Sequence, residues 1–309
     1  MGRRRKGDKV DGWVNFDKPL EMTSTQAVGK VRWLYNAQKA GHAGTLDPLA
    51  TGILPIALGE ATKTIPFMQD ALKTYFFTIK WGEQRSTDDT EGDIIATSDI
   101  RPSAEDINAA LPAYIGDIQQ VPPKFSAIKV DGQRAYDLAR DGEDVQLKAR
   151  SVYIHSLELL ETRADEADFR MICGKGTYVR SLARDLALDL GTKGYIALLR
   201  REAVGGFGEK NAILLDKLED LRNSARLDEA LLPLSAALDD IPALALKENE
   251  IAPLKNGQVL SFVSKPDFDR LEKIGLAANE TALATFQGKA IALIEVEGAQ
   301  IKPVRVFNT

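Results

Sequence analysis

The chain has 309 residues, of which 44% are hydrophobic and 28% are charged, enough for one large core and a smaller second one. It contains no run of about 18 apolar residues, and no apolar stretch follows the basic residues at its start, so we expect neither a membrane span nor a secretory signal. The net charge of -5 argues mildly against nucleic-acid binding, although the basic GRRRK start fits an RNA contact as well as a solvated tail. We expect a soluble protein of two domains.

Few residues could bind a transition metal. Cys173 is the single cysteine and cannot form an internal disulfide, and the two histidines, His42 and His155, are far apart in the sequence. This composition fits a reducing cytoplasm and argues against a zinc site.

The first predicted elements are a strand and a helix. A strand over 12–18 ends at Pro19, and a helix over 23–37 begins with Ser and Thr residues that suit an N-cap. The apolar residues of this helix fall on one face, namely Val28, Val31, Leu34 and Tyr35.

Four further elements follow the loop at 41–52. They are a buried strand over 53–59, a short helix over 61–71, an aromatic strand over 74–82 and a helix over 103–111 that starts with a Ser-x-x-Asp cap signal.

The next part of the chain mixes a turn, strands and helices. Residues 121–142 predict a loop, a strand, a turn at Asp131 and Gly132, and a helix that ends at Gly142. Strands over 150–162 and 167–173 lead into an amphipathic helix that ends at Gly191, with Val179, Leu182, Ala183, Leu186 and Leu190 on its apolar face.

These elements predict a mixed α/β domain without regular βαβ spacing. Past Pro242 the pattern changes to short strands over 282–286, 289–298 and 301–308, separated by glycine turns. We therefore expect two domains, 1–241 and a small β-rich domain over 242–309.

Asp47 is the carboxylate of the glycine-rich loop GHAGTLDPLATG. Followed by Pro48, it could be a plain helix N-cap with proline at the first helical position. Alternatively, the glycines allow close approach of a ligand, and apolar neighbours would shield the carboxylate from water, these being Leu46, Leu49, Ile53 and Leu54.

A shielded carboxylate requires a cation. The loop has no cluster of metal ligands, so an arginine from elsewhere in the chain is the better candidate. A single Asp paired with Arg suits a nucleophile rather than a two-carboxylate acid/base mechanism.

Six separated blocks of sequence, spanning roughly residues 13–207, extend this functional hypothesis. They are FDKP with MTST, KAGHAGTLDPLATGILPIALGEATK, KTYFFTIKWG, QVPPKFSAIKVDGQRAYDLAR, GKGTYVRSLARDL and LLRREAVGGF. In this order they resemble the TruB family of bacterial tRNA pseudouridine synthases. The resemblance implies the pseudouridine-synthase fold with a largely antiparallel central sheet, and the C-terminal segment is similar to a PUA-like RNA-binding domain.

The reaction implied by this resemblance is an isomerisation of uridine 55 in the T loop of tRNA. The N1–C1′ bond is broken and the same uracil is reattached through C5. Such a reaction needs a nucleophile, a way to hold the detached base and a proton acceptor, but no cofactor and no metal. The implied partner is the tRNA T stem-loop, and we expect a cytoplasmic enzyme that acts as a monomer.

The resemblance also implies three catalytic residues. Asp47 matches the family's catalytic aspartate, and attack at C1′, attack at C6 and elimination to a glycal all stay open. Arg180 matches the arginine that pairs with this carboxylate and keeps it ionised. Tyr75 matches the tyrosine that lies against the target base and accepts the C5 proton. Read from the residues alone, Arg180 would be a surface arginine and Tyr75 a core aromatic.

The remaining candidates are implied substrate-binding residues. Leu199 matches an apolar residue that closes the pocket, and His42 matches a histidine that fills the space left by flipped-out bases. Lys18 and Tyr136 are candidates for loop shaping and phosphate contact, together with the basic residues Lys30 and Lys39.

One position departs from the family pattern. Glu21 stands where the family generally has Gly, so a turn with positive φ there has to be remade or strained. Three functions are weighed: a tRNA pseudouridine synthase, a non-catalytic RNA-binding or RNA-folding protein, and a metal- or phosphate-dependent hydrolase that uses Asp47.

Overall fold

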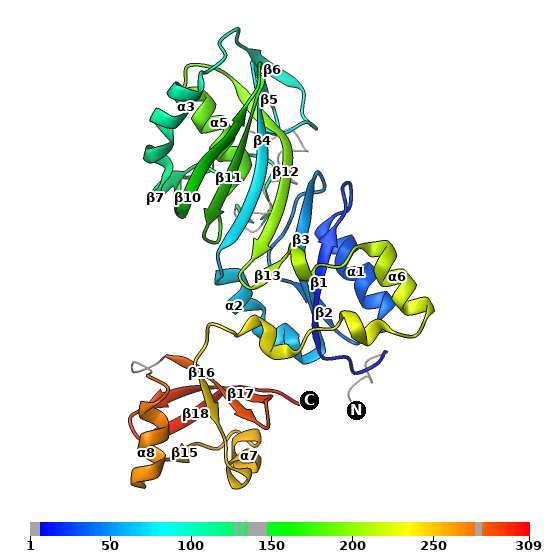
Figure 1. Ribbon diagram of the computed structural model, residues 1–309, viewed down its shortest axis with the longest axis vertical. Helices are drawn as coiled ribbons and strands as arrows, with labels where there is room; N and C mark the ends of the chain where they lie inside the picture. The colour runs from blue at the N-terminus through cyan, green and yellow to red at the C-terminus, as the bar shows by residue number, and fades with distance from the viewer. Residues whose placement is uncertain (1–6, 127–128, 131–132, 135–146, 276–279) are drawn as a thin grey trace.

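The computed structural model describes residues 7–126, 129–130, 133–134, 147–275 and 280–309 (Figure 1). Within these ranges the chain forms a nine-stranded sheet, a five-stranded sheet and two small hairpins, with helices packed on them. No helix in these ranges is long and apolar enough to cross a bilayer. The expected mixed α/β class is confirmed.

The nine-stranded sheet has the strand order β1-β3-β12-β4-β11-β10-β7, with β2 added to β3 and β13 to β12. Its pairs are antiparallel except for β3 with β12, so the sheet is largely antiparallel, as expected. The strands are β1 (Gly12–Lys18), β2 (Ala40–His42), β3 (Ala50–Leu58), β4 (Lys73–Trp81), β7 (Gly116–Gln120), β10 (Arg150–Thr162), β11 (Glu166–Cys173), β12 (Gly194–Val204) and β13 (Phe207–Gly208).

The central strand β12 is absent from the sequence-based expectations. It joins the two halves of the sheet, because Leu199 pairs with Ala50 of β3 on one side and with Phe77 of β4 on the other. Two arginines in its middle, Arg200 and Arg201, interrupt the apolar pattern that would have indicated a buried strand. Strand β7 and the hairpin of β5 (Glu83–Arg85) and β6 (Ile94–Thr97) were also not expected.

The two predicted amphipathic helices form as expected. Helix α1 (Ser24–Leu34) has Thr23 as N-cap, and a reciprocal pair of hydrogen bonds joins Thr23 and Gln26. Helix α5 (Val179–Asp189) buries its apolar face against β12 and β4. The other helices of this part are α2 (Ile65–Asp70), α3 (Ala104–Ala110) and α6 (Leu215–Asn223), with the 3₁₀ turns η1 (Gly59–Thr64), η2 (Leu111–Tyr114), η3 (Glu209–Asn211), η4 (Leu227–Ala230) and η5 (Leu234–Ala237).

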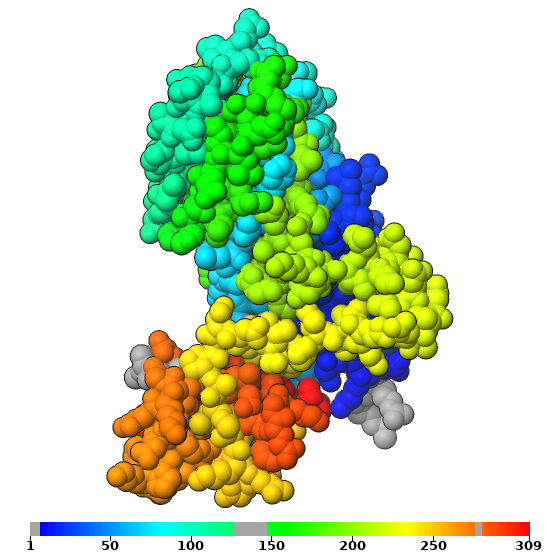
Figure 2. Space-filling view, viewed as in Figure 1, coloured from blue at the N-terminus to red at the C-terminus, as the bar shows by residue number. Residues whose placement is uncertain are grey.

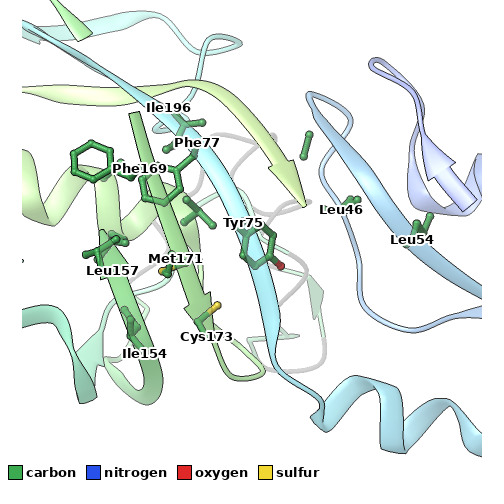
Figure 3. Packing of buried hydrophobic residues seen from close by; sticks show 14 of the residues in the cluster. Leu46, Leu54, Tyr75, Phe77, Ile154, Leu157, Phe169, Met171, Cys173 and Ile196 are labelled. Atoms are coloured by element: carbon green, nitrogen blue, oxygen red, sulfur yellow. The ribbon is translucent and has the colours of Figure 1, made fainter. Parts of the chain in front are cut away.

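Aromatic packing connects the strands next to the site. Phe77 of β4 and Phe169 of β11 are directly opposite each other, and their rings stack with centroids 5.3 Å apart (Figure 3). Both side chains are fully buried and belong to the same core cluster as Tyr75 and Leu46. This packing holds β4 rigidly, and β4 carries Tyr75.

The segment 121–142 is described only in part. Its expected strand corresponds to β8 (Lys129–Val130), which pairs with β9 (Gln133–Arg134), a short strand at the place where the expected helix would begin. The expected turn at Asp131 and Gly132 and the expected helix lie outside the described residues.

The five-stranded sheet has the order β14-β16-β17-β18-β15 and contains the three predicted C-terminal strands. Its elements are β14 (Ala243–Ala245), α7 (Glu248–Lys255), β15 (Leu260–Ser261), α8 (Lys265–Glu272), β16 (Thr281–Phe286), β17 (Lys289–Glu297) and β18 (Gln300–Val306). It packs below the large sheet (Figure 2), where Leu293 and Phe307 share a buried cluster with Trp13 of β1.

Candidate active site

Asp47 lies in the loop between β2 and β3. The N–H of Ala50 donates to the carbonyl oxygen of Asp47 at 3.1 Å, which closes a turn at Pro48 and Leu49. The chain then enters β3 directly. No helix begins at Asp47, so the N-cap interpretation is wrong.

The preceding elements β1 and α1 hold this loop in place. The Ser24 hydroxyl accepts from the N–H of Leu46 at 2.8 Å and donates to the carbonyl oxygen of the same residue at 2.9 Å. The N–H of Glu21 donates to the carbonyl oxygen of Pro48 at 2.9 Å. The residues on either side of Asp47 are thus fixed by hydrogen bonds.

Lys18 is completely buried beneath the loop. Its Nζ donates to the carbonyl oxygens of Pro19 at 2.9 Å, Met22 at 2.7 Å and Pro48 at 3.3 Å. Burial lowers the pKa of Lys18 to about 8, and the nearby Asp47 carboxylate opposes this shift. This geometry supports loop shaping, one of the two roles predicted for Lys18. It does not support the second role, phosphate contact, because the ammonium group is buried.

Arg180 and Asp47 form the predicted ion pair. Nη2 of Arg180, in the first turn of α5, lies 2.8 Å from Oδ2 of Asp47, and Nη1 lies 3.4 Å from Oδ2 of Asp89. The same guanidinium donates to the carbonyl oxygens of Thr87 and Phe125, each at 3.0 Å. Its side chain is 6% exposed, so four protein groups fix its position.

The expectation of a shielded carboxylate is wrong. The Asp47 side chain is 40% exposed because it faces an open pocket. Leu46 and Leu49 border pockets beside it, whereas Ile53 and Leu54 of β3 are fully buried in two core clusters. The free carboxylate is therefore accessible to a ligand without any rearrangement.

Tyr75 and Arg201 lie side by side on β4 and β12, where they pair directly across the two strands. Tyr75 is 9% exposed, and burial raises the pKa of its phenol, which is therefore protonated at neutral pH. Figure 3 shows the Tyr75 hydroxyl on the side of the sheet that faces the loop of Leu46.

Arg201 was missed by sequence reasoning. It is 1% exposed, and it donates to the carbonyl oxygens of Ile53 at 2.7 Å and Gly44 at 3.1 Å, which supports the Asp47 loop from below. Gly52 allows this close approach, since a Cβ there would lie 2.2 Å from the carbonyl oxygen of Arg201. The segment LLRRE contained a signal for Arg201, because side chains alternate along a strand and Leu199 and Arg201 therefore lie on the same face.

These residues line a pocket of about 580 Å³. Its wall includes Asp47, Tyr75, Arg180, Leu199 and Arg201, contributed by the loop before β3, by β4, by α5 and by β12. A volume of this size accommodates a small organic ligand or a nucleotide. Three predicted catalytic residues and the predicted Leu199 thus meet at one site.

Leu199 also borders a smaller pocket on the far side of the ion pair, together with Asp89 and Leu20.

The remaining predicted residues that the structure describes do not line the large pocket. His42 ends β2 and is not among the lining residues; burial, followed by the charge of Arg201, lowers its pKa, so its ring is neutral at pH 7. Tyr136 lies outside the described residues.

Another charged candidate, Lys30, has a partner of its own. Lys30 forms an ion pair with Glu219 at 2.6 Å, on the α1 side of the molecule. In the part of the chain that the structure describes, no three His, Cys, Asp or Glu side chains are grouped as metal ligands.

The fold is also found in solved structures. The structure titled "Structure of H/ACA RNP bound to a substrate RNA containing 2'-deoxyuridine" matches 100% of this chain and 92% of its own, with a TM-score of 0.73 and 21% identity. The structure titled "Crystal Structure of a Cbf5-Nop10-Gar1 Complex" matches 96% and 84%, with a TM-score of 0.72 and 23% identity. This likeness concerns the fold.

Sequence comparison is more specific. Residues 32–179 match the TruB family pseudouridylate synthase N-terminal domain, and residues 180–239 match the tRNA pseudouridylate synthase B C-terminal domain. Proteins named tRNA pseudouridine synthase B from Caulobacter vibrioides (strain ATCC 19089 / CIP 103742 / CB 15) and Rhodospirillum rubrum (strain ATCC 11170 / ATH 1.1.1 / DSM 467 / LMG 4362 / NCIMB 8255 / S1) are 54% and 49% identical. Both matches cover 100% of this chain, and 99% and 100% of the relatives. The chain belongs to the TruB family of pseudouridylate synthases.

Proposed function

We propose that this protein is a tRNA pseudouridine synthase that converts uridine 55 of the T loop into pseudouridine. The observation that carries the proposal is the Asp47 carboxylate, held 2.8 Å from the Arg180 guanidinium and open to a pocket of about 580 Å³. Relatives of similar length that are named tRNA pseudouridine synthase B support the choice of tRNA as substrate.

The reaction rearranges bonds within one nucleotide. The N1–C1′ bond breaks, a C5–C1′ bond forms, the C5 proton is lost and N1 gains a proton, so no electrons enter or leave. Asp47 is the nucleophile or the group that assists elimination, and attack at C1′, attack at C6 and glycal formation are all compatible with its open position.

The residues around Asp47 complete this chemistry. Arg180 orients the carboxylate through a charge-assisted hydrogen bond. Tyr75 packs against the uracil ring, and its phenol oxygen accepts the C5 proton while its phenolic proton is released to water, from which N1 takes up a proton. Leu199 closes the apolar side of the pocket over the base.

Access to the pocket requires the uridine to leave its stack, since a nucleophile in a pocket cannot reach a stacked nucleotide. A neutral His42 ring suits the filling of space that flipped-out bases leave, and buried Lys18 shapes the Asp47 loop. Tyr136 is a further candidate for loop shaping and phosphate contact.

The whole chain serves RNA recognition in this proposal. Residues 1–241 form the catalytic domain, and residues 242–309 form a PUA-like RNA-binding domain built on the five-stranded sheet. The enzyme acts as a monomer in this proposal. A tRNA substrate and a buried, unpaired Cys173 support a cytoplasmic location.

The test is incubation with unmodified tRNA, without added cofactor or metal, followed by mapping of pseudouridine. We expect conversion at uridine 55 by the wild type and a loss of turnover of at least about 10³-fold in Asp47→Asn, with RNA binding retained. Asp165→Asn is the matched control, because this exposed aspartate pairs with Arg101 away from the pocket.

Each competing hypothesis predicts a different result. An RNA-binding or RNA-folding protein would retain full biological activity in Asp47→Asn. A hydrolase would be inhibited by chelators or would release phosphate. Conversion at another uridine would refute the T-loop assignment and leave the chemistry in place.

A further inference from the structure

The mouth of the pocket carries more positive charge than its single carboxylate balances. Its described lining residues include Asp47 and five cations, namely Lys73, Arg150, Lys175, Arg180 and Arg201. Three of these cations are buried and donate to carbonyl oxygens of the protein, Lys73 to Ala71, Arg180 to Thr87 and Arg201 to Ile53. Arg150 and Lys175 are left at the mouth.

Arg150 fixes the turn that carries Lys175. Its Nη2 donates to the carbonyl oxygen of Gly176 at 2.7 Å, and its guanidinium carbon lies 5.0 Å from the centroid of the Tyr178 ring. Gly176 has a φ of +82°, which only glycine adopts without strain. The backbone that places Lys175 is therefore defined in the free protein.

Lys175 is paired in the free protein with an acid on another element. Its Nζ lies 2.6 Å from Oδ1 of Asp70, the last residue of α2, and the two side chains are 72% and 61% exposed. Gln69, next to Asp70, lines the same pocket. The ion pair thus lies beside the pocket and joins the end of α2 to the turn before α5.

An ion pair this exposed is easily exchanged. Solvent screens its charges, and holding two long side chains together costs conformational entropy, so such pairs contribute little to stability. An RNA backbone phosphate offers Lys175 an equally good charge, and its binding also releases condensed counterions into solution. The chain as a whole has a net charge of -5, so its phosphate contacts depend on local cations such as this one.

We propose that Lys175 binds a backbone phosphate of the RNA beside the nucleotide in the pocket, and that Asp70 occupies Lys175 until the RNA displaces it. This inference rests on the proposed function. After the exchange the Asp70 carboxylate stays unpaired close to the RNA and repels it. Asp70 therefore weakens RNA binding, although it makes a favourable contact in the free protein.

The experiment measures the affinity of an unmodified T stem-loop RNA for the full-length protein between 50 and 200 mM salt. Its variants are Asp70→Asn, Lys175→Gln and the double variant, and Glu229→Gln is the matched control. Glu229 pairs with Arg226 at 2.5 Å and is about as exposed as Asp70, but it lies away from the pocket. Its substitution changes the net charge by the same amount as Asp70→Asn.

We expect Asp70→Asn to tighten binding about three- to tenfold at low salt, against less than about twofold for Glu229→Gln. Lys175→Gln is expected to weaken binding and to reduce the slope of log affinity against log salt by about one. In the double variant the gain from Asp70→Asn is expected to shrink to the size of the control.

Two outcomes would overturn the proposal. One is an Asp70→Asn gain no larger than that of Glu229→Gln, and the other is an undiminished gain in the absence of Lys175. Either result is compatible with a wild-type enzyme that makes pseudouridine, so failure of this inference is distinct from failure of the proposed function. All three substitutions are at exposed side chains, and far-ultraviolet circular dichroism checks that the four variants fold.

Discussion

Buried polar side chains position Asp47, although most of them do not take part in the chemistry themselves. Ser24 bonds both backbone groups of Leu46, Lys18 bonds the carbonyl of Pro48, and Arg201 bonds the carbonyl of Gly44. Each of these contacts satisfies a loop carbonyl or N–H that would otherwise be costly to leave unpaired. The loop can therefore leave its carboxylate exposed and still hold one conformation.

Lys18 makes the stability of the protein depend on pH in a defined direction. The folded chain releases the Lys18 proton near pH 8, whereas the unfolded chain holds it to about 10.5. Between these values the unfolded state binds more protons, so the free energy of unfolding rises with pH. The contribution of Lys18 to this rise is at most about 1.4 kcal/mol per pH unit.

Lys18→Met removes this contribution. The variant keeps Lys73, which is also buried, and burial lowers the pKa of Lys73 to about 8 as well. We expect the free energy of unfolding of the wild type, minus that of Lys18→Met, to increase between pH 8 and pH 10. Urea unfolding at several pH values measures the difference. A difference that stays constant with pH would contradict the prediction.

Asp47 and Arg180 were predictable because each lies in a long sequence block that resembles the family. The sequence could not show that Arg180 also contacts Asp89 and the carbonyl of Phe125, since these residues are separated from it by more than fifty positions. The same holds for Arg201, which resembles a surface arginine until β12 pairs with β3 and β4.

At the scale of elements, the short connection between β1 and α1 positions the Asp47 loop. Glu21 has a φ of +63° at the position where the family generally has Gly, so the turn keeps its left-handed conformation and bears the strain. The N–H of Glu21 donates to Pro48, which explains why the turn keeps this shape.

Glu21→Gly is expected to raise the free energy of unfolding by about 0.5–1 kcal/mol, because relief of the left-handed strain exceeds the added entropy of the unfolded chain. Glu21→Ala keeps the strain and is the control for loss of the exposed side chain. Thermal or urea unfolding compares the two variants. Equal stabilities would show that the turn is unstrained.

Element prediction succeeded where the chain repeats a simple pattern. Helix α5 has a regular apolar face, and the paired strands β10 and β11 formed as expected, with two register shifts between them. Strand β12 did not follow a simple pattern, because Arg200 and Arg201 occupy its middle and find partners only in the folded state. Arg200 pairs with Asp17 of β1, while Arg201 supports the Asp47 loop.

At the scale of the whole molecule, the five-stranded sheet is packed against the catalytic part rather than joined to it by a free linker. Phe307 is fully buried in a cluster with Trp13 and Phe207, whose rings have centroids 5.6 Å apart. Lys63 adds a polar contact, since its Nζ donates to the carbonyl oxygen of Val306 at 2.7 Å. Contacts of the apolar cluster and of Lys63 therefore fix the two sheets relative to each other.

Phe307→Ala is expected to lower the free energy of unfolding by about 3–5 kcal/mol, because a large buried ring is replaced by a cavity. Val304→Ala is the control in β18, three residues before Phe307, where a side chain 40% exposed is expected to change stability by less than about 0.5 kcal/mol. Urea unfolding followed by tryptophan fluorescence compares them. Similar midpoints for the two variants would show that Phe307 does not stabilise the contact between the sheets.

The sequence by itself determined the class of the fold, the main helices and strands, the C-terminal strands and the identity of the Asp47 and Arg180 pair. The fold class and the elements depend on local periodicity, and the pair was implied by the long blocks that resemble the family. The tertiary structure decided the exposure of Asp47, the support from Lys18 and Arg201, the central place of β12 and the Lys175–Asp70 pair beside the pocket. Each of these depends on contacts between segments distant in the chain, and such contacts exist only after the sheets have paired and packed.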